Sequence, residues 1–344
     1  MNNNPLVYTP IEASTAGEEY VEFRRSNEGS GMPLYIPSLE FKTVKEKGED
    51  VEKGFVPVMP SETISVIARP GHYKTGFMLR WARERAKDLS ARADAGDELA
   101  AKSVVVVVSL EQKVEELRLF HVAAEEKISM SKIVNGGKDL EWDKVTRGLR
   151  KLHTTPIWFI GRSMKRRKLR ADMNEDNIYS ALESIEQWQD ENQTQVIDSV
   201  FYDYLQKFRP PSHVDLVEYY GTLMNTIWKW GSDFMTRNVI GVQAKREVDK
   251  RSPQIPLMDD GQWSSTIEQF SDGVLSLVRP CLYPDKTFDG VEVVGKDQLL
   301  ITCLKRKLGP ANFNGWVKAD PRYNSLNDNE IKEYNFRVSK GYDE

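Results

Sequence analysis

Lys74 and Thr75 close a short turn after an apolar run, and together they have the chemistry needed to hold a phosphate. Residues 63–67 are apolar enough to predict a strand, and residues 68–75 read Ala-Arg-Pro-Gly-His-Tyr-Lys-Thr before a helical pattern begins. In a loop of the Gly-x-x-x-x-Gly-Lys-Thr type, backbone N–H groups and the lysine bind phosphates, while the hydroxyl binds Mg²⁺. A helix that starts at the threonine also points its positive end at the anion.

The loop departs from this pattern at both glycine positions, which Ala68 and Tyr73 occupy. The alternative interpretation is an ordinary strand–turn–helix corner that carries a glycine and an exposed lysine. In the functional interpretation the segment binds nucleotide through the following residues: Arg69, Pro70, Gly71, His72, Tyr73, Lys74, Thr75 and Gly76.

Three more polar residues stand where apolar runs stop. Asp203 ends one run and is suited to Mg²⁺. Glu111 follows a run of five valines and is suited to orienting or deprotonating water. Gln243 ends a third run and is suited to sensing a γ-phosphate. Taken singly, a turn aspartate, a first-turn glutamate favoured by a helix dipole and a solvated loop start explain them. Their joint order favours a nucleotide site.

The elements that must position these residues form an α/β pattern. The valines at 104–108 are typical of a central strand covered on both faces. Strands are predicted at 64–68, 103–109, 157–160, 199–203, 239–243, 273–278, 298–303 and 315–318. Helical spacing recurs at Ile178, Leu182, Ile185 and Trp188, and at Leu216, Tyr220, Leu223, Ile227 and Phe234. This alternation predicts a mostly parallel, twisted sheet flanked by helices, with ligands beyond the carboxyl ends of its strands.

Composition excludes several classes of protein. The 344 residues have a net charge of −4, two cysteines and four histidines. Two cysteines are too few for a disulfide framework, and the scattered histidines give no metal spacing. No run approaches the roughly 20 apolar residues of a membrane helix. We therefore expect a cytoplasmic protein with no membrane partner.

The chain is expected to divide into three parts. Residues 1–60 hold ten acidic and six basic side chains with little periodicity, and they predict an extended, irregular arm that docks onto the body or onto a neighbouring subunit. Residues 61–325 form the α/β domain, and residues 326–344 form a C-terminal tail.

At this point the chain resembles the motor domain of the DnaB-type replicative helicases, within the RecA-like family. The similarity spans roughly residues 55–325. It is carried by 67–75, Ser109-Leu-Glu111, Asp203-Tyr-Leu-Gln206, Ser265-Thr-Ile-Glu-Gln269 with Asp272, and Lys305-Arg-Lys-Leu-Gly-Pro310.

The resemblance implies a ring, usually hexameric, with ATP and Mg²⁺ between subunits and single-stranded DNA in the central channel. It implies that Glu111 is the general base, Asp203 the Mg²⁺ ligand and Gln243 the sensor. It also implies that Lys305 and Lys307 reach the γ-phosphate of the neighbouring subunit. Partner proteins of replication or recombination would follow, in a bacterial, phage or plasmid setting.

Departures from the family put turnover in doubt more than the fold. A ring at Tyr73 restricts the backbone and is expected to crowd the phosphates, whereas Ala68 is a milder change. Lys307 stands at the family's arginine finger and supplies one compact charge instead of a planar fork. A one-residue shift would promote Arg306 instead. Residues 1–60 are too short for the family's primase-binding domain.

Nucleic acid is expected on two loops that follow the Mg²⁺ strand and the sensor strand. Their candidate phosphate contacts are Lys207, Arg209, Lys245, Arg246, Lys250 and Arg251. The alternative is solvated loop charge, partly neutralised by Glu247 and Asp249. A denser basic run at 162–170 is better explained as a solvated loop. Tyr323 is suited either to stacking on adenine or to anchoring the tail.

Two further functions stay open beside a DNA-translocating ATPase. One is a RecA-like, ATP-binding oligomer that switches assembly without unwinding DNA. The other is a remnant that keeps only the fold. Tyr73 and Lys307 favour these alternatives. Retention of all five of the other site residues favours the motor, namely Lys74, Thr75, Glu111, Asp203 and Gln243.

Overall fold

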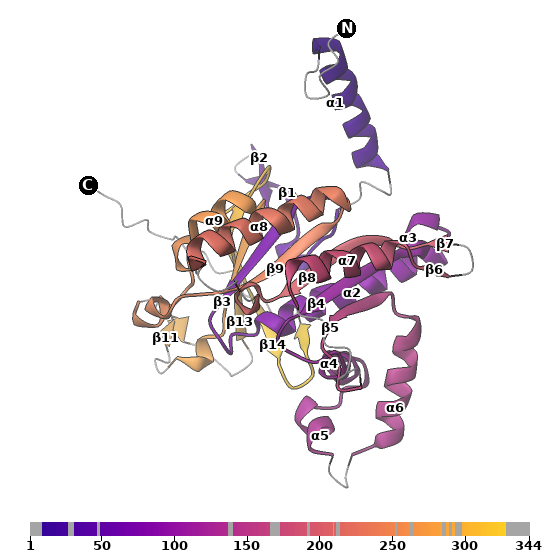
Figure 1. Ribbon diagram of the computed structural model, residues 1–344. Coiled ribbons are helices and arrows are strands. Elements are labelled where there is room, and N and C mark those ends of the chain that lie inside the picture. The colour runs from indigo at the N-terminus through magenta and orange to yellow at the C-terminus, as the bar shows by residue number, and fades with distance from the viewer. Residues whose placement is uncertain are drawn as a thin grey trace.

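The computed structural model is an α/β domain built on a nine-stranded, mostly parallel sheet with helices on both faces (Figure 1). It describes residues 9–26, 31–46, 49–136, 140–165, 173–190, 193–208, 210, 214–251, 253–261, 264–283, 287–288, 291–292 and 298–327. The predicted mostly parallel sheet, flanked by helices, is confirmed.

The sheet runs in the order β15-β14-β13-β10-β3-β9-β8-β4-β5. Its six parallel strands are β3 (Thr63–Ala68), β4 (Ser103–Ser109), β5 (Ile157–Gly161), β8 (Val196–Asp203), β9 (Arg237–Gln243) and β10 (Gly273–Val278). Antiparallel strands extend the β10 edge, namely β13 (Gln298–Arg306), β14 (Phe313–Asp320) and β15 (Ser325–Asn327). Short hairpins pair β1 (Lys42–Glu46) with β2 (Glu49–Lys53), β6 (Gln189–Asp190) with β7 (Gln193–Thr194), and β11 (Thr287–Phe288) with β12 (Val291–Glu292).

Helices cover both faces because successive strand residues point to opposite sides. In β4, Val105 and Val107 join the core under one face, while Val104, Val106 and Val108 join the core under the other. The first core includes α2 (Lys74–Asp94), and the second includes α7 (Glu175–Glu186) and α8 (Leu216–Asp233). The remaining helices are α3 (Glu98–Lys102), α4 (Val114–Glu126), α5 (Met130–Asn135), α6 (Trp142–Lys151) and α9 (Ser264–Phe270).

The N-terminal arm is more ordered than its sequence indicated. Residues 10–25 form α1 (Pro10–Arg25), which stands away from the sheet in Figure 1. Its signal was a capping box, in which Thr9 and Glu12 bond each other's backbone N–H groups. The expectation of an irregular arm is therefore wrong for this segment.

The second half of the arm docks onto the body, as expected. Leu34 and Phe55 are almost fully buried in the core that contains α2. The Trp81 indole donates to the Pro33 carbonyl at 2.7 Å, and Arg80 donates to the Leu34 carbonyl at 2.8 Å. The arm thus supports the helix that begins at the phosphate loop.

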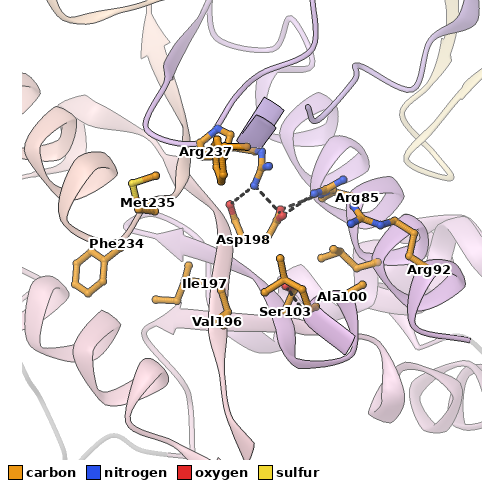
Figure 2. A pocket seen from close by; sticks show the side chains of 14 residues that line it. Arg85, Arg92, Ala100, Ser103, Val196, Ile197, Asp198, Phe234, Met235 and Arg237 are labelled. Atoms are coloured by element: carbon orange, nitrogen blue, oxygen red, sulfur yellow. Dashed lines mark hydrogen bonds and ion pairs between the residues drawn. The ribbon is translucent and has the colours of Figure 1, made fainter. Parts of the chain in front are cut away.

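A closed ionic network lies at the amino ends of the parallel strands (Figure 2). Asp198 on β8 accepts from Arg85 at 2.6 and 2.9 Å and from Arg237 at 2.9 Å. All three side chains are at most 6% exposed. They border a cavity of about 280 Å³ that Phe23 of α1 also lines. Among the described residues, no helix has the length and apolar content to cross a bilayer.

Candidate nucleotide site

The phosphate loop joins β3 to α2 through a tight turn with two residues in the left-handed region. Gly71 has a φ of 83°, and Tyr73 has a φ of 71° directly before the helix. No side chain of the described residues caps α2. Its first amides are therefore open to an anion, and the helix dipole favours negative charge there.

Tyr73 takes the conformation that glycine takes in such loops, and its ring packs behind the loop. The ring lies so close to Gly76 that a Cβ there would approach it to 2.4 Å. Its hydroxyl bonds the Asn324 Oδ1 at 2.8 Å, and the ring packs against the core that contains α2. The ring is thus held by the core and by Asn324, and the crowding of phosphates expected from the sequence stays a prediction.

Thr75 and Asp203 come together at the ends of α2 and β8. The Thr75 hydroxyl donates to the two carboxylate oxygens of Asp203 at 2.9 and 3.1 Å. Asp203 is buried, and burial raises the pKa of its carboxyl, with Lys74 and Thr75 opposing the shift. A buried carboxylate whose neighbours do not balance its charge is suited to a cation.

Lys74 is directed into the same place. Its ammonium lies 3.7 Å from the centroid of the Tyr204 ring, a cation–π contact. Burial lowers the pKa of Lys74 to about 8, and the carboxylates of Asp203 and Glu111 act in the opposite direction. An arriving phosphate would add negative charge beside this buried ammonium.

Glu111 follows β4 and Gln243 ends β9, the two strands that flank β8, and each residue is tied to the segment after β8. Glu111, about half exposed, pairs with Lys207 at 3.6 Å. The Gln243 backbone N–H donates to the Gln206 side chain at 3.0 Å. The structure thus brings the predicted Mg²⁺ ligand Asp203, the predicted base Glu111 and Lys74 to the carboxyl edge of the sheet. Sequence analysis missed the roles of Tyr204 and Gln206, although both stand in the quoted Asp-Tyr-Leu-Gln segment.

Among the other residues of the phosphate loop, Arg69 and His72 bond to other parts of the protein, whereas Pro70 and Gly71 are exposed. Arg69 bonds Asp249 at 2.8 Å, and Pro70 and Gly71 lie exposed at the turn. The His72 Nδ1 accepts from the Arg279 N–H at 3.0 Å. Burial lowers the pKa of His72 to about 4, so this imidazole is neutral at pH 7 and can accept.

The three candidates for contacting a neighbouring subunit are all engaged within their own chain. Arg306 is buried and bonds Glu62 at 2.6 Å and the carbonyls of Val56 and Pro57 at 3.0 and 2.9 Å. In this conformation Arg306 is engaged within its own subunit, and the one-residue shift that would make it the finger stays a prediction. Lys307 pairs with Asp272 at 3.3 Å but stays largely exposed.

Lys305 donates to the Glu268 carbonyl at 2.5 Å. This contact joins β13 to α9, so the ammonium holds two elements of the same subunit together. Of the two lysines, Lys307 is the more exposed candidate for a contact in trans.

The predicted nucleic-acid residues fall into three groups. Lys245 donates to the Asp259 carbonyl at 3.0 Å and Arg251 pairs with Asp260, so both brace the loop after β9. Arg246 and Lys250 are exposed and form no ion pair with any residue that the structure describes. Lys207 faces Glu111, as stated above. Arg209 and most of the basic run at 162–170 lie outside the described residues.

Tyr323 lies in the turn between β14 and β15. It lines a small cavity of about 100 Å³ with Lys127, Lys132 and Lys144. Its neighbour Asn324 contacts Tyr73, so the turn after β14 does reach the phosphate loop. The proposed stacking of Tyr323 on adenine stays a prediction.

The residues present fit a magnesium–nucleotide complex. Among the described residues, no group of three or more His, Cys, Asp and Glu side chains could form a metal cage. Mg²⁺ does not need one, because it is typically held by one or two protein oxygens together with phosphates and waters. Thr75 and Asp203 supply such oxygens beside an open helix end.

Comparison with known families agrees with this geometry. A family model described as the DnaB-like helicase C terminal domain matches residues 47–313, most of the chain. The chain belongs to this family.

Two relatives with similar sequences are replicative DNA helicases named DnaB. The chain is 23% identical to the replicative DNA helicase DnaB of Haemophilus influenzae over 72% of this chain and 49% of that protein. It is 22% identical to DnaB of Mycoplasma pneumoniae over 94% of this chain and 64% of that protein. The chain thus spans about half to two thirds of the length of these relatives.

Solved structures share the fold. One of them, an ATPase domain, aligns with a TM-score of 0.69 at 18% identity, covering 91% of this chain and 97% of that one. A DnaB-like replicative helicase, studied with its interactions with primase, aligns with a TM-score of 0.68 at 18% identity, covering 94% of this chain and 68% of that chain.

Proposed function

We propose that this chain is an ATPase motor that acts on single-stranded DNA as a ring-shaped oligomer, with MgATP held at subunit interfaces. Membership of the DnaB family supports the class of activity. The observation that carries the proposal is the buried Asp203 carboxylate, which meets Thr75 and the field of Lys74 beside an uncapped helix end.

Each residue at this edge has a distinct task. Lys74 leaves the Tyr204 ring to contact the β- and γ-phosphates, and the amides that open α2 complete the anion site. Thr75 and Asp203 hold the magnesium and its waters. MgATP, when bound, supplies the phosphoryl group that water attacks. Once its ion pair with Lys207 opens, Glu111 orients that water and accepts its proton.

DNA is the proposed substrate because two cations on the loop after β9, Arg246 and Lys250, pair with no carboxylate of the described chain. They are the first and last residues of η4 (Arg246–Lys250), and ring symmetry would repeat this pair around a channel. Cations that track a backbone suffice for binding without sequence preference. The cytoplasm, six subunits and replication partners belong to the same proposal.

A second candidate is an ATP-binding switch with little turnover. It is favoured by the engagement of Arg306 and Lys307 within their own subunit. Without an arginine supplied in trans, nucleotide would still bind and organise an oligomer. Hydrolysis would then lack its usual charge stabilisation.

ATP hydrolysis with and without single-stranded DNA separates the two candidates. The motor predicts turnover that DNA stimulates, and it predicts that Lys74→Ala and Glu111→Gln each reduce turnover by about 100-fold or more. The matched controls are Lys113→Ala and Glu116→Gln, an exposed pair 3.8 Å apart at the start of α4. Both controls should keep wild-type turnover.

The remaining outcomes are equally informative. Nucleotide binding without turnover supports the switch. No nucleotide binding at millimolar ATP, in a folded protein, defeats both candidates.

A further inference from the structure

Arg69, at the start of the phosphate loop, is bound to the loop that follows β9. Its Nε and Nη2 donate to the Asp249 carboxylate at distances of 2.8 to 3.1 Å, a forked contact. Its Nη1 donates to the Ala244 carbonyl at 3.0 Å. Arg69 is 13% exposed, so part of this contact is shielded from water. Forked, charge-assisted contacts fix geometry as well as distance.

The other half of the phosphate loop is tied to the same carboxylate through Tyr283. The Tyr283 hydroxyl bonds Asp249 at 3.3 Å, and its ring lies 5.3 Å from the His72 ring. Arg279 binds His72 and the Gly71 carbonyl at 3.0 and 3.3 Å. Asp249 is therefore linked to one side of the turn directly, through Arg69, and to the other side indirectly, through Tyr283 and His72.

Asp249 sits on η4 (Arg246–Lys250), the turn that carries the two candidate DNA-binding cations. Val248 is fully buried and anchors this turn, whereas Arg246 and Lys250 are exposed. Asp249 lies directly beside Lys250 and is itself 41% exposed. An anion bound by Arg246 and Lys250 would therefore lie on the same turn as the Asp249 carboxylate that binds Arg69.

We propose that Asp249 is a positioning residue that couples the phosphate loop to the DNA-binding turn. DNA phosphates drawn to Arg246 and Lys250 shift η4, and the Asp249–Arg69 contact transmits that shift to residues 69–73. Nucleotide binding moves the same contact in the reverse direction, since coupling between two sites is reciprocal. This rests on the proposed function and adds the link between its two ligands.

The test compares Asp249→Asn with Glu247→Gln. Glu247 is an exposed acid on the same turn, without an ion pair to any described residue, so its variant removes the same charge and leaves Arg69 bound. The first measurement is hydrogen–deuterium exchange without ligand. Asp249→Asn should speed exchange in the peptides covering 68–76 and 244–251 together, and Glu247→Gln should leave both unchanged.

The second measurement is the affinity for a non-hydrolysable ATP analogue with Mg²⁺, with and without an oligo-dT strand. In the wild type, DNA should tighten the analogue by a factor within the usual range of coupling, about 5- to 150-fold. In Asp249→Asn that factor should fall to about 2 or less, while the affinity without DNA changes little. Asp249→Glu, which keeps the charge, should restore part of the coupling.

Three results overturn the inference. One is full coupling in Asp249→Asn. Another is an equal loss of coupling in Glu247→Gln, which would make the effect one of net charge. The third is a wild type that binds nucleotide but shows no response to DNA. A wild type that binds neither ligand refutes the proposed function as well. The exchange measurement needs no ligand, so unchanged exchange in Asp249→Asn refutes the Asp249–Arg69 contact by itself.

Discussion

The two ends of β8 each bury an aspartate, and they treat it in opposite ways. At the amino end, burial alone would raise the pKa of Asp198, but the guanidiniums of Arg237 and Arg85 hold it well below its usual range. At the carboxyl end, burial raises the pKa of Asp203, and Lys74 with Thr75 does not reverse the shift. Asp198 is paired with two arginines, whereas the charge of Asp203 is incompletely balanced.

This difference separates a structural network from a binding site. The arginines around Asp198 come from β9 and α2, so they join three elements of the body (Figure 2). Asp203 accepts a hydrogen bond from the Thr75 hydroxyl, whereas the Lys74 ammonium lies over the Tyr204 ring. Uncompensated buried charge is what a protein keeps where a ligand completes the site.

The largest effect is expected from Asp198→Asn. This change removes the carboxylate that two buried guanidiniums share, although Arg85 keeps its pair with Asp88. Breaking a buried network of this kind costs about 3–5 kcal/mol. Urea unfolding should show the loss, while nucleotide affinity of the folded fraction stays the same. A loss below about 1 kcal/mol would contradict the account of the amino edge.

Asp203→Asn should raise the free energy of unfolding, whereas Asp198→Asn should lower it. Because the pKa of Asp203 is raised in the folded state, the folded protein binds more protons than the unfolded chain, and its stability falls as pH rises above about 4. Removing the charge should therefore stabilise the protein by about 1 kcal/mol at pH 7, and the gain should fade at acidic pH. Unfolding curves across pH measure this, and magnesium-dependent nucleotide binding should be lost. A destabilised variant would contradict the comparison.

Tyr73→Gly tests whether the ring belongs to the core or to the nucleotide. A non-glycine residue at positive φ costs about 1–2 kcal/mol, but burial of the ring contributes about 1.5–3 kcal/mol. We expect a net loss near 1 kcal/mol in unfolding free energy, with the KM for ATP changed less than about threefold. A large rise in turnover would show instead that the ring obstructs the phosphates. Asn324→Ala is the partner control, since it removes the hydroxyl's acceptor and keeps the loop.

The smallest effect is expected from Lys207→Ala. An exposed ion pair such as Glu111–Lys207 contributes about 0–1 kcal/mol. Stability should hardly change, and basal turnover should stay equal or rise modestly because Glu111 is released. A steep loss of turnover without DNA would make Lys207 part of the catalytic site. Lys245→Ala, in the other loop, is the comparison variant.

Much of the sheet could be predicted because its signals are local. The valines of β4 and the ends of β8 and β9 are readable from runs of apolar residues, and the strand ends place Glu111, Asp203 and Gln243 at one edge. The helix α1 was missed because its exposed surface lacks an apolar stripe, although its capping box was legible.

The rest depends on partners distant in sequence. Arg306 looked free because its acceptor, Glu62, lies near the other end of the chain. The Tyr73 ring could not be placed without Asn324, and Arg69 could not be separated from the ligand-binding residues without Asp249. Types and spacing indicate which residues can do chemistry, and packing decides which of them are already engaged.

The most direct test of the carboxyl edge is calorimetric titration of the wild type, Lys74→Ala and Asp203→Asn with a non-hydrolysable ATP analogue, with and without Mg²⁺. The account predicts magnesium-dependent binding by the wild type and its loss in both variants, each still folded by circular dichroism. Equal binding in all three proteins, or none by the wild type at millimolar analogue, would contradict it.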